Sequence, residues 1–233
     1  MRTTIEAAFS HHVDQLTDST PFRRLECGEA SSEDFDRFLA NLIRTHVKSP
    51  QLVAFLYALA PPDASGDVLH NLLEELGTED ESGVAHPAML HDLAARAGLA
   101  PVLPELERLA ADDLRRIASE PLLFATLKEV GLAALCEVVA FEFMLSRVAS
   151  RIERALETHR GLSPEALTWF HHHSEVDIAH AEQGLRHIED YVRYYGFDEE
   201  DARSLIELTL RENVLIKRYF TQVSPTTASA GGG

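Results

Sequence analysis

The sequence predicts a single all-α domain, and three observations support this prediction. Apolar residues recur at helical spacing from Ser31 to Phe220, no run alternates with the two-residue period of a strand, and the interruptions fall at glycines and prolines. With 233 residues and 45% apolar side chains, the chain can bury one sizeable core. We expect the domain to span 1–223 and the small, polar tail 224–233 to be disordered.

Caps and breaks set the expected helix boundaries. Ser31 and Ser32, followed by acidic residues, are typical of a helix N-terminus, and Ser163-Pro164 precedes another helix. Residues 131–144 are almost wholly apolar, as expected for a helix that is buried on all sides. These signals predict a bundle of seven to eight helices, with assigned segments near 31–47, 49–60, 68–76, 86–98, 121–159, 164–195 and 198–220.

The composition argues against several classes of partner. The formal charge is −17, from 21 basic and 38 acidic residues, whereas nucleic-acid binding requires a clustered basic surface. No apolar stretch approaches the roughly 20 residues that span a bilayer, and residues 1–6 lack the apolar core of a signal peptide. Cys27 and Cys136 are too few for a disulfide framework. We therefore expect a cytoplasmic protein that binds neither nucleic acid nor membrane.

The most specific chemical signal is the set His173, Asp177 and His180, at positions i, i+4 and i+7 of a predicted helix. Their directions around the helix differ by no more than about 60°, so all three side chains project from one stripe. Two imidazoles and a carboxylate form half of a typical nitrogen and oxygen site for iron with open positions for dioxygen. The alternative interpretation is a solvated, histidine-rich surface.

Glu137 strengthens the metal interpretation, because it lies in the apolar stretch that begins at Gly131. An unpaired charge there would cost several kcal/mol, so the carboxylate requires a cation. The nearest basic residues, Lys128 and Arg147, are roughly three turns away along the same helix, which makes a metal ion the predicted partner. Glu142 projects about 140° away from Glu137 and is expected to make a hydrogen bond or a surface contact.

A second pair of donors, Glu75 and His86, flanks a loop bounded by glycines. Their spacing would place them on one face of a continuous helix, but the glycines and a proline interrupt that helix. The loop must therefore fold to bring the two residues together. Glu74 and Glu79 are alternative carboxylates in the same region, and the choice among the three stays open.

Three blocks of sequence contain these candidate ligands. They are Asn71-Leu-Leu-Glu-Glu-Leu-Gly77 with His86-Pro87-Ala-Met-Leu90, Gly131-Leu-Ala-Ala-Leu-Cys-Glu137, and His173-x3-Asp177-x2-His180 followed by Ala181-Glu182-x-Gly184. Together the blocks, which span about half of the chain, resemble the haem-oxygenase-like di-iron oxidase family. The resemblance implies a haem-oxygenase-like helical bundle in which a di-iron site replaces the porphyrin. It also implies six metal ligands: Glu75, His86, Glu137, His173, Asp177 and His180.

The resemblance further implies two Fe2+ ions, dioxygen as co-substrate, and oxidation of a small organic molecule through a peroxo-type intermediate. Members of the family oxygenate the nitrogen of amines, carry out oxidative C–C cleavage or decarboxylation of amino and fatty acids, or form an aminobenzoate. N-oxygenating members commonly have a further carboxylate ligand on the preceding helix, but this chain has no Asp or Glu between Leu42 and Pro62. That absence favours oxidative C–C cleavage, decarboxylation or desaturation of an amino or fatty acid, with N-oxygenation of an amine as the alternative.

Four further residues are candidates for an extra ligand or a supporting contact: His46, His187, Glu142 and Glu79. His46 lies in the segment that lacks carboxylates and could take the place of the missing ligand. His187 continues the stripe of His180 and could orient a ligand or relay protons. Besides the substrate, the expected partners are an external electron donor and a second copy of the chain, with which it would form a homodimer.

Two other classes of protein remain as alternatives. Thiaminase-like and pyrroloquinoline-quinone-synthesising proteins share the helical fold without metal, and Cys136 would be the candidate nucleophile, although no activating base lies near it in sequence. A non-catalytic iron-binding protein would bind metal without turnover. Ferritin-like bundles are excluded, because they require Glu-x-x-His pairs and the chain has no Glu three residues before a His.

Overall fold

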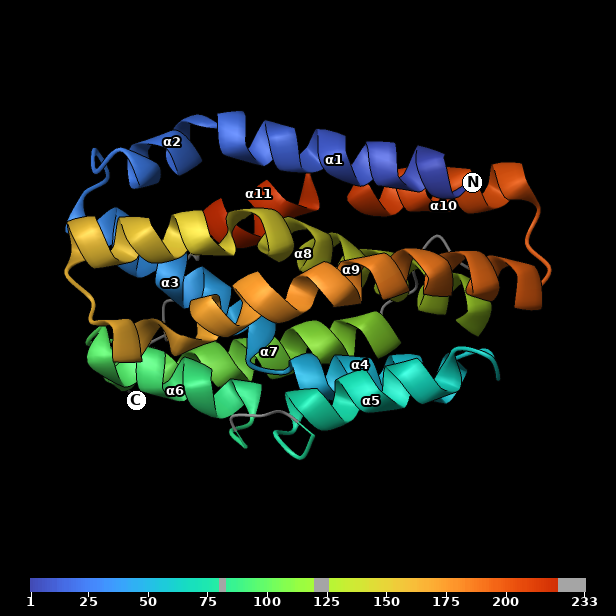
Figure 1. The fold of residues 1–233 in the computed structure, drawn as a ribbon, viewed down its shortest axis with the longest axis horizontal. Helices are drawn as coiled ribbons and strands as arrows, with labels where there is room; N and C mark the ends of the chain where they lie inside the picture. Colours follow the sequence, from blue (N-terminus) through green and yellow to red (C-terminus); the bar gives the residue numbers. More distant parts are fainter. Residues whose placement is uncertain (80–82, 120–125, 222–233) are drawn as a thin grey trace, which may run out of the picture.

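The computed structural model describes residues 1–79, 83–119 and 126–221, which form an elongated bundle of helices (Figure 1). These ranges contain eleven α-helices and no β-strand, which confirms the predicted all-α class. None of the described helices is long and apolar enough to cross a bilayer. The tail expected to be disordered, 224–233, lies outside the described residues.

Two long helices form the centre of the bundle. α8 (Leu127–Ala155) and α9 (Thr168–Tyr194) pack against each other along much of their length. Most side chains in the middle of α8 are buried, as its apolar composition predicts. The two helices approach closely at Gly184, where a Cβ atom would lie 2.6 Å from a methyl carbon of Val139. A glycine on α9 therefore permits the close contact between the central helices.

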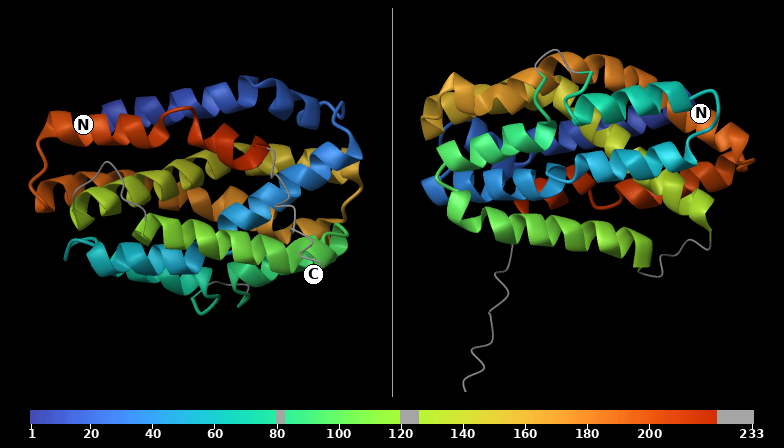
Figure 2. Two further views of the ribbon diagram at one scale, coloured as in Figure 1. Left: turned by 180° about the vertical axis from the view of Figure 1, so that it is seen from behind. Right: turned by 90° about the horizontal axis from the view of Figure 1, so that it is seen from below.

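The remaining helices cover this pair. Figure 1 shows α1 and α10 above it and α4, α5 and α6 below it, and the view from behind shows α3, α7 and α11 on the face opposite to α9 (Figure 2). Their bounds are α1 (Arg2–Asp18), α2 (Thr20–Glu26), α3 (Ser32–His46), α4 (Ser49–Leu59), α5 (Ser65–Glu75), α6 (His86–Arg96), α7 (Leu103–Ser119), α10 (Glu199–Leu210) and α11 (Val214–Phe220).

Most predicted boundaries agree with the structure, but the described helices outnumber the expected seven to eight. Three of them, α1, α2 and α7, lie in stretches where the cap signals assign no boundary. The helix expected from 121 begins at Leu127, after a capping box formed by Thr126 and Glu129; residues 120–125 lie outside the described ranges. The single helix predicted over 198–220 is wrong. It divides because Glu212 and Asn213 adopt positive φ angles of 64° and 51°.

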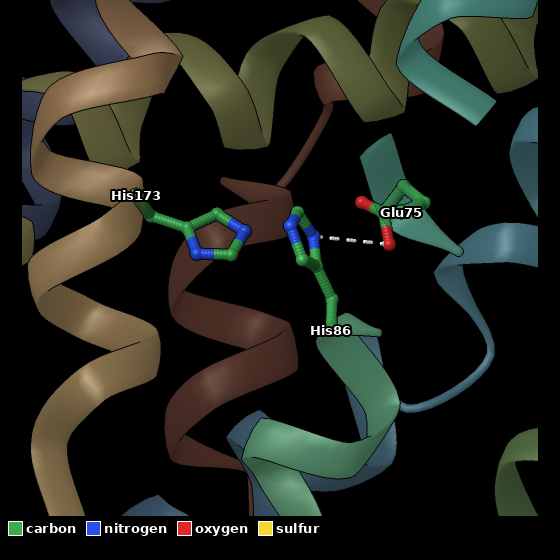
Figure 3. A group of neighbouring side chains, drawn as sticks. All are labelled: Glu75, His86 and His173. Atoms are coloured by element: carbon green, nitrogen blue, oxygen red, sulfur yellow. Dashed lines mark ion pairs between the residues drawn. The ribbon is translucent and has the colours of Figure 1, made fainter. Parts of the chain in front are cut away.

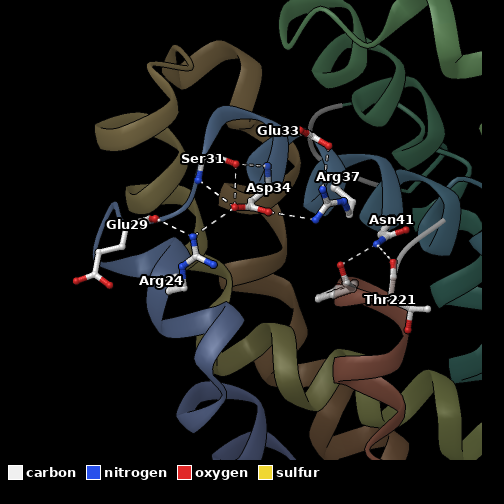
Figure 4. Close-up of polar contacts among 9 residues, drawn as sticks. Arg24, Glu29, Ser31, Glu33, Asp34, Arg37, Asn41 and Thr221 are labelled. Carbon is white, nitrogen blue, oxygen red and sulfur yellow. Dashed lines mark hydrogen bonds and ion pairs between the residues drawn. The ribbon is translucent and has the colours of Figure 1, made fainter. Parts of the chain in front are cut away.

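Side-chain hydrogen bonds fix the start of α3 and the end of α11 (Figure 4). The Ser31 hydroxyl accepts a hydrogen bond from the Asp34 N–H, and the Asp34 carboxylate accepts one from the Ser31 N–H, both at 3.1 Å. This capping box confirms the predicted N-terminus. Further along α3, the buried Asn41 amide donates to the carbonyls of Tyr219 at 3.0 Å and Thr221 at 2.9 Å. These two bonds attach the end of α11 to α3.

We expect Gly184→Ala to lower the free energy of unfolding by about 1–3 kcal/mol, because the added methyl group would overlap Val139 in the α8 and α9 contact. Gly66→Ala is the matched control, since its Cβ would meet nothing within 4 Å, and it should change that free energy by less than about 1 kcal/mol. Urea denaturation measures both variants. Equal stability of the two would contradict the close approach.

Candidate metal centre

Three predicted donors from three helices meet inside the bundle. Glu75 ends α5, His86 begins α6 and His173 lies on α9, and one donor atom of each lies within 4.8 Å of the other two. The Nδ1 atom of His86 is 3.2 Å from Oε2 of Glu75, and the His173 ring faces the other side of His86 (Figure 3). Both histidines are buried. The structure therefore brings together donors from both halves of the predicted site.

A second group of donors lies beside the first. The Nε2 atom of His180 is 2.9 Å from Oε2 of Glu74, and its Nδ1 atom is 3.6 Å from Oδ1 of Asp177. Asp177 is only 2% exposed, and its Oδ2 atom has no hydrogen-bond partner among the described residues. Glu142 of α8 is close enough for its charge to act on both Asp177 and His180. These four side chains form a second potential ligand group.

The three carboxylates that the sequence leaves as alternatives occupy different places. Glu75 belongs to the first group and accepts a hydrogen bond from the Ser49 hydroxyl at 2.5 Å. Glu74 belongs to the second group through its contact with α9. Glu79 is 45% exposed and contacts His70 instead. Two adjacent carboxylates, rather than one of the three, therefore reach the cluster.

Burial and mutual contacts set the protonation states of the metal-free cluster. Burial raises the pKa of Asp177 to about 7, and it also raises the pKa of Glu142. Burial opposes the charged form of His180, but its close contacts with the carboxylates of Asp177 and Glu74 outweigh this effect and raise its pKa to about 11. Burial lowers the pKa of His173 well below its ordinary value. In the absence of metal, His180 therefore holds a proton that a metal ion would displace.

Glu137 has a cationic partner in the protein, an arginine from a distant helix, where the sequence favours a metal ion over the basic residues near it in sequence. Nε of Arg218 on α11 donates to Oε1 of Glu137 at 2.9 Å, and Nη2 of the same guanidinium lies 2.7 Å from that oxygen. Asp113 of α7 lies 4.0 Å from Arg218 and accepts two hydrogen bonds from Arg44, at 2.7 and 2.8 Å. Glu137 thus belongs to an ion-pair network that joins α3, α7, α8 and α11.

His46 and His187, the remaining candidates for an extra ligand or a supporting contact, lie in different surroundings. The Nε2 atom of His46 is 2.8 Å from the Tyr219 hydroxyl, and the His46 ring centroid lies 5.1 Å from that of Trp169. Burial lowers the pKa of His46 to about 4, so its imidazole is neutral. His187 contacts Asp67 at 3.3 Å, and Asp67 is 53% exposed. His46 therefore lies in the interior beside the site, whereas His187 pairs with a residue at the surface between α5 and α9.

Two residues beside the donors have no role in the sequence prediction. Trp169 stacks on His173 with 4.0 Å between ring centroids, and its carbonyl accepts a hydrogen bond from Nδ1 of His173 at 2.8 Å. Trp169 precedes His173 by four residues on the same helical face, so the spacing could have indicated this contact. The Nε2 atom of His172 lies 3.0 Å from Nε2 of His86. A residue next to His173 in sequence projects in another direction and gives no such signal.

A cavity adjoins the donors. Its lining includes six of them: Glu75, His86, Glu142, His173, Asp177 and His180. Apolar side chains of α4 and α8 line another part, namely Leu52, Val53, Val138, Phe141 and Leu145. The ion-pair network of Arg44, Asp113, Glu137 and Arg218 borders the same space. A small organic molecule bound here would lie directly beside the donor groups.

The donor chemistry fits iron. Imidazole and carboxylate ligands suit this metal, and the unpartnered Asp177 oxygen, within the part of the chain described, is an acceptor that a buried cation would use. Fold and site together define an all-helical protein with a candidate metal centre of histidines and carboxylates. The profile of a family described as iron-containing redox enzymes matches residues 36–213, and the chain belongs to that family. This membership confirms the family resemblance that the sequence motifs predict. A comparison with curated proteins finds no match.

We expect metal binding to release about one proton per chain at pH 8, where His180 is charged in the metal-free protein and Asp177 is already ionised. The number of protons released should increase as the pH falls through about 7, because Asp177 is then also protonated before metal binds. Calorimetric titration with Co2+ in two buffers of different ionisation enthalpy measures the released protons. Heats independent of the buffer would contradict a protonated His180.

Proposed function

We propose that the protein is a non-haem di-iron enzyme that activates dioxygen to oxidise a small organic molecule. The observation that supports this proposal most directly is the pair of ligand groups in one buried cluster. The first comprises Glu75, His86 and His173, and the second is centred on Asp177 and His180. One iron ion would leave several of these buried groups without a cation, whereas two would use both groups.

We assign the α8 ligand to Glu142 in place of Glu137. The charges of His180, Glu74 and Glu75 all act on Glu142, so this member of the second group also lies near the first. Glu137 is held by Arg218 instead. The other five ligands are those that the resemblance implies: Glu75, His86, His173, Asp177 and His180. Glu74 contacts His180 and would orient its ring or share in metal binding.

The surrounding residues hold these ligands in position. Bound iron would supply the electrons and open coordination positions for dioxygen chemistry. The Trp169 carbonyl can only accept a hydrogen bond, so Nδ1 of His173 bears the proton and Nε2 is available to a metal ion. Asn71 donates to Oε1 of Glu142 at 3.0 Å and orients that carboxylate. Phe141 presents an apolar surface to the cavity and limits the access of water.

Oxidation at a carbon atom of an amino or fatty acid is the reaction we propose. No carboxylate lies between Leu42 and Pro62 to provide the ligand typical of N-oxygenating relatives. His46, the substitute in that segment, is engaged with Tyr219 through one ring nitrogen. The cavity also offers apolar walls for a hydrocarbon portion. N-oxygenation of an amine is the alternative. The external electron donor, the homodimer and the cytoplasmic location stay predictions.

The metal-free alternative has less support. Cys136 is fully buried, and burial raises the pKa of its thiol, which disfavours the nucleophilic thiolate. A non-catalytic iron-binding function would not require a cavity beside the ligands. Oxygen consumption that depends on an added substrate distinguishes an enzyme from such a binding protein.

Anaerobic titration of the metal-free protein with Fe2+ should show two equivalents bound per chain, and mixing with oxygen should produce a transient long-wavelength absorbance. Glu142→Gln should lose at least one equivalent, because it removes a charged ligand of the second group. Glu137→Gln on the same helix is the matched control and should retain both equivalents, since its carboxylate pairs with Arg218. Iron bound after desalting and the absorbance change measure the difference.

The two substitutions also separate the alternatives. Loss of iron in Glu137→Gln with retention in Glu142→Gln would return the α8 ligand to Glu137. Absence of iron uptake by the wild-type protein would overturn the di-iron function itself.

A further inference from the structure

A line of aromatic side chains leads away from the candidate metal ligand His173. Trp169 stacks on His173 with 4.0 Å between ring centroids, and the His46 ring centroid lies 5.1 Å from that of Trp169. The Nε2 atom of His46 is in turn 2.8 Å from the Tyr219 hydroxyl. Trp169 and Tyr219 are only 1% and 0% exposed. These rings, which belong to α9, α3 and α11, therefore form a continuous series of contacts from the metal centre to Tyr219.

Tyr219 lies between two cavities. His46 lines the cavity beside the metal donors, whereas Tyr219 and Phe220 line a second cavity that α2, α3 and α11 enclose. Arg24 and Arg37, which Figure 4 shows beside Asp34 at the start of α3, also line this second cavity. The two arginine side chains are 48% and 33% exposed, so solvent reaches the space. The series of rings thus connects the metal centre with a cavity that is open to small solutes.

Packing alone does not explain the hydroxyl group of Tyr219. A phenylalanine would fill nearly the same space, and a buried hydroxyl costs free energy unless it forms a hydrogen bond. The partner of this hydroxyl is an imidazole, which is able to take up a proton. Burial lowers the pKa of His46 to about 4, so the ring is neutral, and in the tautomer with its proton on Nδ1 the Nε2 atom accepts from Tyr219. Such a pair allows a phenol to lose an electron and a proton together.

We propose that Trp169, His46 and Tyr219 form a redox relay that delivers an electron from Tyr219 to the buried metal centre. This inference rests on the proposed function, because the oxidant is the iron centre after its reaction with dioxygen. The electron passes through Trp169 and reduces the centre by one electron. The O–H bond of Tyr219 breaks, the proton moves to Nε2 of His46, and a neutral phenoxyl radical remains on Tyr219.

The proton transfer makes this oxidation feasible inside the protein. An oxidised phenol is a far stronger acid than an imidazolium, so the proton moves to His46 even though burial disfavours the charged ring. A small one-electron reductant such as ascorbate, bound in the second cavity, then reduces the phenoxyl radical, and the proton returns from Nε2 to the phenol oxygen. The relay thereby removes an oxidising equivalent from a metal centre that holds no substrate.

Tyr191 provides a matched control for Tyr219. It is also buried, at 2% exposed, and its hydroxyl donates a hydrogen bond at 3.1 Å to the carbonyl of Lys128, which is too weak a base to take the proton. Tyr191 lies on α9 about six helical turns beyond Trp169, far from the proposed relay. Tyr191→Phe therefore removes one buried phenol hydroxyl and leaves the relay intact.

Flash photolysis of the metal-free protein tests the relay without iron. Trp169 is the single tryptophan, so a flash that only indole absorbs photoionises one known residue. In the wild type and in Tyr191→Phe, the indolyl radical should decay as phenoxyl absorbance rises. This transfer should be slower in D2O, because a proton moves with the electron.

Two variants separate the parts of the relay. Tyr219→Phe should lose the phenoxyl signal, and so should His46→Phe, which keeps an aromatic ring but removes the proton acceptor. An indolyl radical with the same lifetime in the wild type and in Tyr219→Phe would overturn the relay.

Electron paramagnetic resonance of the iron-loaded protein tests the connection with the metal centre. Rapid freezing after mixing with oxygen, without substrate, should trap a phenoxyl radical in the wild type and in Tyr191→Phe, but not in Tyr219→Phe. Iron that binds and reacts with oxygen without producing this radical would overturn the proposal. Absence of iron uptake, with the phenoxyl signal intact in the metal-free protein, would contradict the di-iron function and leave the relay standing.

Discussion

The burial of several carboxylates and imidazoles inside one helical bundle is the constraint on which the rest of the structure depends. Transfer of an unpaired charge from water to the interior costs several kcal/mol. Two pairs, His86 with Glu75 and His180 with Glu74, offset part of this cost in the metal-free protein. Asp177 still has a buried oxygen that no described residue satisfies. Cations between these groups would complete the compensation, so metal binding should also stabilise the fold.

The central helices keep this cluster in one geometry. Gly184 follows His180 by one helical turn, and its close approach to Val139 fixes α9 against α8 next to the ligands. The opposite wall of the cavity depends on α11, which supplies Arg218 and is attached to α3 through Asn41. The same packing that forms the core therefore positions both the ligand groups and the space for a substrate beside them.

Helical periodicity is a local property, which explains why the sequence predicts the all-α fold and the shared stripe of His173, Asp177 and His180. Contacts between distant segments have no local signal. Arg218 reaches Glu137 across 81 residues, so the sequence around Glu137 gives no sign of its partner and predicts only a hydrogen bond or a surface contact for Glu142. The division of the last predicted helix at Asn213 likewise depends on a left-handed backbone conformation that asparagine tolerates but does not require.

Diffraction from crystals of the iron-loaded protein at the iron absorption edge tests the central claim most directly. The two ligand groups predict two anomalous peaks per chain, one bordered by His86 and His173 and the other by Asp177 and His180, with Glu142 beside them. A single peak, or peaks bordered by Glu137 and remote from Glu142, would contradict this account of the site.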